Sequence, residues 1–190
     1  MMFQHLKLAG FKSFADIAEL DIEAGLTGIV GPNGCGKSNI VEALKWVMGE
    51  SSARQMRSTE MDDVIFSGTS SKTARNLAEI SLMLDNQQKT APSEYNDTEE
   101  IEITRKIIRG KGTSYRINNR PARARDVQLL FADSATGARS AGIVSQGRIG
   151  AIVGAKPEDR RTLLEEAANI KGLHQRKHEA ELRLSNAELN

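Results

Sequence analysis

The glycine-rich stretch at residues 31–38 limits the fold of this chain more than any other part of its sequence. It reads Gly-Pro-Asn-Gly-Cys-Gly-Lys-Ser and fits the pattern G-x-x-x-x-G-K-[ST] without a mismatch. Apolar residues at 26–30 predict a buried strand before it, and an apolar face over residues 40–48 predicts a helix after it. A chance glycine turn would need neither the full motif nor both flanks. The order strand, loop and helix therefore predicts a phosphate-binding loop.

The residue types of this loop explain how it would hold a phosphate. Its glycines let successive backbone N–H groups point at one anion, and the N-terminus of the following helix adds its dipole. Lys37 would reach the β- and γ-phosphates, and Ser38 would offer its hydroxyl to Mg²⁺. The predicted cofactor-binding residues in this stretch are Gly31, Pro32, Asn33, Gly34, Cys35, Gly36, Lys37, Ser38 and Asn39.

Composition limits the number of domains and the kinds of partner. At 190 residues the chain can bury one core, which indicates one domain or one domain with an extension. Its net charge is only +1, so affinity for nucleic acid would have to come from a local patch. The single cysteine, Cys35, excludes an internal disulfide and indicates a reducing compartment; it is either a redox switch or a small loop residue. Without a secretory signal or a long apolar run, the sequence predicts a soluble intracellular protein.

Two alternating segments before the loop predict a pair of strands, at residues 3–8 and 17–22. The sequence Gly-Phe-Lys-Ser-Phe at 10–14 separates them. Because these strands lead directly into the loop, we expect them to form an antiparallel flap beside the ligand. Lys12 and Ser13 would then lie near the phosphates or the base.

A basic stretch lies further along the chain, over three predicted strands at residues 76–85, 100–108 and 113–117. Eight cations and no acid lie between residues 104 and 125. They either form a solvated basic face or contact the phosphate backbone of DNA, a sequence-independent interaction that weakens with salt. The eight are Arg105, Lys106, Arg109, Lys111, Arg116, Arg120, Arg123 and Arg125.

The last third of the chain predicts two helices around a short strand. Residues 124–132 predict a short helix, and an apolar strand at 141–145 ends at Gln146. The amide oxygen of such a glutamine can bind Mg²⁺ and order an attacking water. Pro157 begins the second helix, in which a shift of the apolar spacing predicts a break and then the start of a coiled coil.

Several of these stretches together resemble the N-terminal head segment of the bacterial structural maintenance of chromosomes (SMC) ATPases. The resemblance is carried first by Gly-Phe-Lys-Ser-Phe at 10–14 ahead of the loop at 31–39. It extends over essentially the whole chain, and the ordered set is far more specific than the loop alone. The further matching stretches lie at residues 49–57, 61–68, 143–147, 156–161 and 165–168.

This resemblance implies roles that the residue patterns alone leave open. Arg57 matches an arginine that reaches a nucleotide phosphate in the same head, and Gln146 matches the Q-loop glutamine of ATP-binding-cassette (ABC) ATPases. Asp63 belongs to a stretch, 61–66, that would lie against the base or ribose. The implied cofactors are ATP and Mg²⁺. The implied catalytic residues are Lys37, Ser38, Arg57 and Gln146, with Ser38 and Gln146 as ligands of the metal.

The resemblance also favours DNA contact for part of the basic stretch. Arg123 and Arg125 match basic positions that touch double-stranded DNA on the upper surface of the head, and Arg120 joins them in the predicted DNA-binding set. Some relatives carry a basic residue where this chain has Glu60, so no DNA contact is expected from that position.

The implied fold is the N-terminal lobe of an α/β P-loop NTPase of the ABC-ATPase kind, with a mixed β-sheet, an antiparallel β meander and a C-terminal helix that starts a coiled coil. The expected division is a head lobe at residues 1–156 and a helix leading into the coiled coil at 157–190. An ABC ATPase also needs a signature Leu-Ser-Gly-Gly, a Walker B strand and a switch histidine, and we find none in this sequence. In the SMC family these motifs lie in a C-terminal segment, so we expect this chain alone to be inactive as an ATPase.

The expected function is that of the ATP-binding half of an SMC head, in a condensin-type protein of chromosome condensation and segregation. The implied partners are the C-terminal head segment, a second head and hinge in a homodimer, a kleisin-type subunit and double-stranded DNA, without a membrane. The implied location is the cytoplasm, at the nucleoid. Three alternatives stay open: a coiled-coil ABC ATPase of double-strand-break repair, a P-loop kinase of a small metabolite, and a DNA-binding module that does not hydrolyse ATP.

Overall fold

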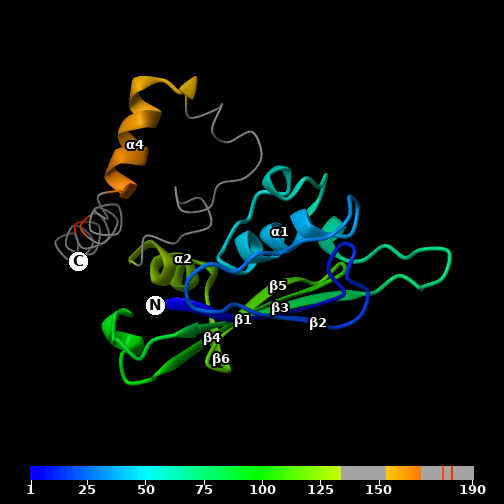
Figure 1. The fold of residues 1–190 in the computed structure, drawn as a ribbon, viewed down its shortest axis with the longest axis horizontal. Coiled ribbons are helices and arrows are strands. Elements are labelled where there is room, and N and C mark those ends of the chain that lie inside the picture. The colour runs from blue at the N-terminus through cyan, green and yellow to red at the C-terminus, as the bar shows by residue number, and fades with distance from the viewer. Residues whose placement is uncertain (134–152, 168–176, 178–180, 182–190) are drawn as a thin grey trace, which may run out of the picture.

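The structure, a computed structural model, describes residues 1–133 and 153–167, together with Lys177 and Glu181. Its centre is a sheet of six strands in the order β2-β1-β3-β4-β5-β6, and all neighbouring strands are antiparallel (Figure 1). The strands are β1 (Met2–Ala9), β2 (Ala18–Asp21), β3 (Leu77–Asp85), β4 (Glu100–Ile108), β5 (Gly112–Ile117) and β6 (Arg120–Ala122). The helices are α1 (Lys37–Val47), α2 (Ala124–Asp133) and α4 (Pro157–Ala167), and short 3₁₀ helices span Arg54–Met56, Met61–Val64 and Ser93–Tyr95.

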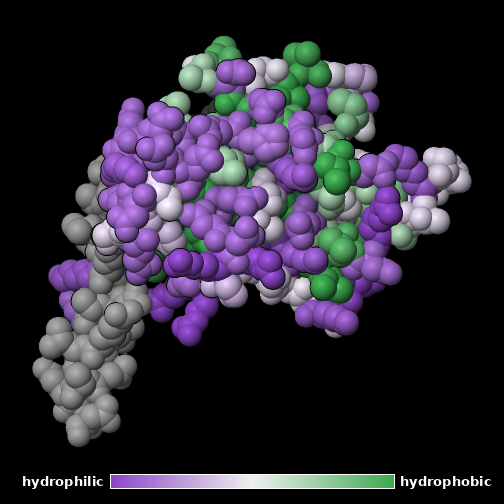
Figure 2. Space-filling view, turned by 90° about the horizontal axis from the view of Figure 1, so that it is seen from below, coloured by the Kyte–Doolittle hydropathy of each residue, from purple (hydrophilic) through white to green (hydrophobic). Residues whose placement is uncertain are grey.

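Alternating apolar residues give the sheet one buried face. α1 and α2 cover this face (Figure 1), and their residues Trp46 and Phe131 are fully buried against it. The opposite face is largely hydrophilic, as Figure 2 shows. Burial of each large apolar side chain contributes about 1.5–3 kcal/mol to stability. The buried face therefore fixes both the register of the strands and the position of α1 on the sheet. One buried row crosses four neighbouring strands through Leu6, Leu82, Ile103 and Ile117.

Most of the predicted elements in the described part of the chain are confirmed. The predicted meander is formed by β3, β4 and β5, and β6 extends it by a further strand. Asn118 and Asn119 make the turn between β5 and β6, with the left-handed φ angles of 47° and 64° that a two-residue hairpin turn favours. α2 corresponds to the helix predicted at 124–132, and α4 begins at Pro157 as predicted.

The predicted buried strand at residues 26–30 is wrong in this structure. The segment is not part of a strand, and the exposed fractions of Leu26 and Val30 are 98% and 92%. Its apolar pattern is that of a strand covered on both sides, and none of the six strands of the described sheet pairs with it. The described sheet is antiparallel throughout. Because the segment at 26–30 does not join it, the parallel pairing expected of a mixed sheet is not seen in it.

Some predictions fall outside the described residues. These are the strand at 141–145, Gln146 after it, and the break and most of the coiled-coil segment beyond residue 167. Within the part of the chain that the structure covers, no helix is long and apolar enough to cross a membrane.

Candidate nucleotide-binding site

The predicted phosphate loop leads directly into α1. Gly36 precedes the helix with a left-handed φ of 99°, which glycine adopts without a steric penalty. The ammonium group of Lys37 donates to the carbonyl oxygens of Gly31 and Pro32, both at 2.6 Å, so the cation lies within the loop. Ser38 is exposed in the first turn of α1. A cation, a hydroxyl and the N-terminus of a helix together suit a phosphate group and its metal ion.

The turn at Phe11–Phe14 closes on this loop. Phe11 and Phe14 exchange backbone hydrogen bonds of 3.0 and 2.8 Å. A Cβ atom at Gly36 would lie 2.7 Å from the Ser13 hydroxyl oxygen and 3.1 Å from the ring of Phe14, so only glycine fits there. The amide of Asn39 donates to the Ser13 hydroxyl at 2.8 Å. The structure therefore brings Ser13 and Asn39 to the loop, as the sequence predicts.

Lys12 lies elsewhere. Its ammonium group forms an ion pair with Glu42 of α1 at 2.5 Å and donates to the carbonyl oxygen of Met56. Its backbone N–H donates to the Val64 carbonyl at 2.8 Å. Lys12 therefore links the turn to α1 and to the backbone at Met56 and Val64 instead of lying at the phosphate loop.

Arg57 contacts two residues in the first two turns of α1. It ends the 3₁₀ helix Arg54–Met56 with a left-handed φ of 50°. Its Nε pairs with the second carboxylate oxygen of Glu42, and its Nη2 lies 3.4 Å from the amide oxygen of Asn39. The structure thus places Arg57 beside the predicted phosphate loop, with 59% of its side chain exposed.

Glu42 is a site residue that the sequence patterns did not single out. It is only 6% exposed, and it joins two of the predicted site residues through its two carboxylate oxygens. The signal was present: Glu42 lies one turn before Trp46 in α1, so an amphipathic helix places both residues on the buried face.

Asp63 has a local partner. Its carboxylate accepts the backbone N–H groups of Thr59 and Glu60 at 2.9 and 2.8 Å and caps the 3₁₀ helix Met61–Val64. The residues after it, 64–66, are buried in the core. Most of this stretch therefore serves the core and its own cap in this structure.

The basic stretch divides into buried and exposed members. Arg105 is 3% exposed and lies between the rings of Trp46 and Tyr115, so it does not belong to a surface patch. Burial lowers the pKa of Arg105 to about 10. Lys106 pairs with Glu79 at 3.5 Å on the opposite face of the sheet. The exposed members are Arg109, Lys111, Arg116, Arg120, Arg123 and Arg125.

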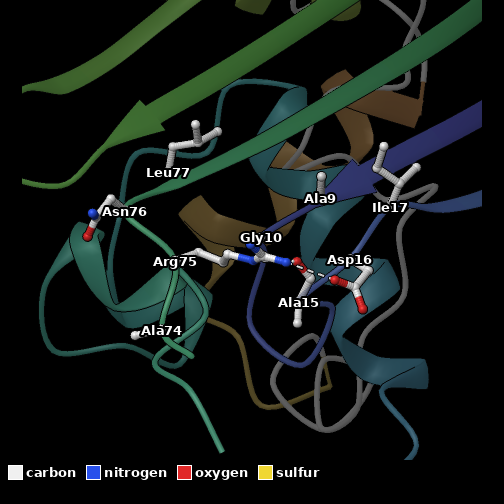
Figure 3. Close-up of a pocket in the computed structure, with 9 residues that line it drawn as sticks. All are labelled: Ala9, Gly10, Ala15, Asp16, Ile17, Ala74, Arg75, Asn76 and Leu77. Carbon is white, nitrogen blue, oxygen red and sulfur yellow. Dashed lines mark hydrogen bonds and ion pairs between the residues drawn. The ribbon is translucent and has the colours of Figure 1, made fainter. Parts of the chain in front are cut away.

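A pocket of about 810 Å³ lies next to the Phe11–Phe14 turn (Figure 3). Arg75 points across it to Asp16, with its Nη2 at 2.8 Å from the carboxylate, and Lys72 holds the other carboxylate oxygen at 2.5 Å. Lys72 and Arg75 keep the pKa of Asp16 below its usual value. The residues that line this pocket include none of the predicted cofactor-binding residues.

Comparison with known sequences identifies the family. The RecF/RecN/SMC N-terminal domain family matches residues 2–139. A chromosome partition protein Smc from Rhodopseudomonas palustris is 58% identical over the whole chain, and one from Bacillus subtilis is 43% identical over 97% of it. The chain spans only 16% and 15% of the lengths of these two relatives.

Solved structures agree with the sequence comparison. An Smc head domain with an extended coiled coil, bound to the C-terminal domain of ScpA and derived from Pyrococcus furiosus, has a TM-score of 0.83 and 30% identity. It covers all of this chain, which covers 47% of it. A structure from a study of ATP-driven dimerization of SMC ATPases has a TM-score of 0.75 and 31% identity, with 88% of this chain and 99% of that one covered. The chain therefore belongs to the RecF/RecN/SMC N-terminal domain family, in the form found in SMC heads.

Proposed function

We propose that this chain is the ATP-binding half of an SMC ATPase head, in a protein that acts in chromosome partition. The observation that supports this most directly is the placement of Lys37 within a glycine loop at the start of α1, with Arg57 and Asn39 beside it. The relatives are named chromosome partition proteins, which favours this function over a repair ATPase or a small-molecule kinase.

Each residue of the site has a task that its position suits. Lys37 would neutralise the β- and γ-phosphates, and Ser38 would bind Mg²⁺ with Gln146, which the resemblance supplies. The metal would withdraw charge from the phosphate oxygens. Arg57 would bind phosphate oxygens with the exposed part of its guanidinium. Ser13 and Asn39, joined by a hydrogen bond, would lie beside the bound nucleotide.

The proposed site is completed by another segment of the protein. The apolar residues at 26–30, two of which are more than nine-tenths exposed, have the pattern of a strand that is buried on both faces of a sheet. We propose that the C-terminal head segment supplies the neighbouring strands together with the signature and Walker B motifs. A second head in a homodimer would close over the ATP, and residues 1–156 and 157–190 would be the head lobe and the helix into the coiled coil.

Further partners follow from the surface and from the relatives. Exposed Arg120, Arg123 and Arg125 suit contact with the DNA backbone, which needs cations and no base-reading element. Related heads have been solved in complex with ScpA, which supports a kleisin-type partner here. We place the protein in the cytoplasm, at the nucleoid.

ATP turnover tests the proposal. It is measured at saturating Mg²⁺ for this chain alone and for this chain mixed with the C-terminal head segment of the same protein. We expect turnover only in the mixture, and we expect Lys37→Ala to abolish it because the phosphates lose their central cation. Robust turnover by the 190-residue chain alone would contradict the proposed division of the site and would bring back the small-molecule kinase.

A further inference from the structure

Glu42 is a carboxylate buried between two cations in the second turn of α1, the helix that follows the proposed phosphate loop. We propose that Glu42 is a positioning residue for Arg57, and that Lys12 helps it by fixing the backbone that carries Arg57. The inference rests on the proposed function, because it gives Glu42 a task only if Arg57 meets a nucleotide phosphate. Glu42 itself would not touch the nucleotide.

The ion pairs of Glu42 use its two oxygens separately. One oxygen accepts the Lys12 ammonium group, and the other accepts the Nε of Arg57. A carboxylate that is 6% exposed is costly to bury unless it is paired and hydrogen-bonded, so both contacts are needed to hold it there. Removing its charge would leave two cations without their shared anion.

Lys12 connects the same carboxylate to the backbone before Arg57. Its ammonium group also donates to the carbonyl oxygen of Met56, the residue that directly precedes Arg57. The backbone here is already constrained, because Arg57 has a left-handed φ of 50° and donates its N–H to the Arg54 carbonyl at 3.1 Å. The side chain and the backbone of Arg57 are thus both tied, directly and through Lys12, to Glu42.

The contacts of the Arg57 guanidinium determine the direction in which it points. Glu42 takes the Nε edge, and the Asn39 amide oxygen lies 3.4 Å from Nη2, in the first turn of α1. Arg57 still exposes 59% of its side chain, so the rest of the guanidinium is accessible next to the phosphate loop. An arginine that is already oriented loses less conformational entropy when it binds a phosphate, which is the advantage of a positioning residue.

The test uses the full-length protein and the variants Glu42→Gln, Arg57→Ala and their double. Glu42→Gln keeps the size of the side chain and removes its charge. We expect it to lower kcat about tenfold and to change the Kd of a fluorescent ATP analogue less than about threefold, because the loop with Lys37 is intact. The double variant should turn over ATP no more slowly than Arg57→Ala, since Glu42 acts through Arg57.

A readout without nucleotide separates positioning from catalysis. We expect Glu42→Gln to increase hydrogen exchange in peptides that cover residues 54–58, measured by mass spectrometry on the nucleotide-free protein. Glu19→Gln is the matched control, since Glu19 pairs with Lys7 at 2.8 Å on the far face of the sheet. It should leave turnover and exchange at 54–58 unchanged. If Glu42→Gln does not fold, Glu42→Asp, which keeps the charge but retracts the carboxylate, should show the same pattern more weakly.

Two results would overturn the inference. The first is wild-type turnover in Glu42→Gln, and the second is a double variant slowed by the product of the two single effects. Failure of the proposed function looks different, because the wild-type protein would then show no ATP turnover that Lys37→Ala removes.

Discussion

Arg105 of β4 stacks on the indole of Trp46 in α1, 4.2 Å from the ring centroid, and donates to the Trp46 carbonyl oxygen at 2.6 Å. The ring of Tyr115 lies on the guanidinium at 4.7 Å, and a second hydrogen bond of 2.6 Å reaches the Glu50 carbonyl. The Trp46 carbonyl in the last turn of α1 thus accepts both the Gly49 N–H, at 3.1 Å, and Arg105, and the Glu50 carbonyl lies just beyond the helix. A cation at this end is also favoured by the helix dipole. One end of α1 is anchored to the sheet, and the other end carries Lys37.

Replacing Arg105 with Ala should strongly destabilise the head. The Glu50 and Trp46 carbonyls would each lose their bond from Arg105, although Trp46 keeps the Gly49 N–H, and two aromatic rings would lose their cation. We therefore expect a loss of about 3 kcal/mol in the free energy of unfolding. Urea denaturation of the head assembled from this chain and the C-terminal segment measures it. Arg116→Ala is the control, because exposed Arg116 on β5 should change the value by less than about 0.5 kcal/mol. Equal stability of the two variants would show that Arg105 anchors nothing.

The Tyr115 hydroxyl predicts a change of stability at alkaline pH. Burial raises the pKa of Tyr115 to about 12, so in the folded state it keeps a proton that an unfolded tyrosine releases near pH 10. Its contribution is therefore present below about pH 10 and is lost as the pH rises toward 12. Arg105 acts in the opposite direction, because burial lowers its pKa to about 10 and the unfolded state then holds the extra proton.

The variant Tyr115→Phe separates the effect of Tyr115 on stability at alkaline pH from the opposite effect of Arg105. The hydroxyl has no hydrogen-bond partner among the described residues, so at neutral pH the variant should be as stable as the wild type or up to about 1 kcal/mol more stable. Between pH 10 and 12 the variant should gain stability relative to the wild type. Denaturant unfolding at several pH values checks this, and a constant difference across that range would refute the assignment.

Gly10 predicts a steric effect that a matched glycine lacks. Its φ is 64°, and a Cβ atom there would lie 2.2 Å from the carbonyl oxygen of Leu77. Gly110 has a similar φ of 70° but open space around it. Gly10→Ala should therefore cost about 3 kcal/mol or more in unfolding free energy, against about 1 kcal/mol for Gly110→Ala. Similar losses in thermal unfolding would mean that β1 moves away from Leu77 at little cost.

The sequence predicts those helices, strands and turns whose formation depends on local patterns. The alternation in β3 and β4, the Asn118–Asn119 turn and the start of α4 at Pro157 each follow from a signal within a few residues. The segment at 26–30 carries an equally clear pattern, but a strand exists only with a partner, and no strand of the described part supplies one.

The candidate site was predictable as a set of residues and less so as a geometry. Spacing and resemblance select Lys37, Asn39 and Arg57, which the structure brings together. The burial of Glu42 and Arg105 was not predicted, because charged residues are rarely fully buried. Yet Arg105 falls in phase with the inward isoleucines of β4, so the alternation itself places it inside.

The exposed segment at 26–30 predicts where this chain would contact the proposed C-terminal head segment. If Val30 becomes a buried strand residue in the assembled head, Val30→Lys should weaken binding of the C-terminal segment at least about tenfold, because the ammonium group would lose its water. Isothermal titration measures the affinity. Met2→Lys, at an exposed apolar position of β1, should bind normally. Unchanged binding by Val30→Lys would place the contact elsewhere.

The exposed arginines at the start of β6 and α2 predict the salt dependence of DNA binding. Each phosphate contact contributes about 0.9 to the slope of log K against log salt, so Arg123→Glu with Arg125→Glu should reduce that slope by about 2. Fluorescence anisotropy of a labelled duplex with full-length protein at several salt concentrations gives the slope. Lys89→Glu is the control, since Lys89 is exposed in the loop between β3 and β4. If the proposed contact is to phosphate, the loss should be the same for duplexes of different sequence. A slope equal to that of the control would leave these arginines as a solvated face.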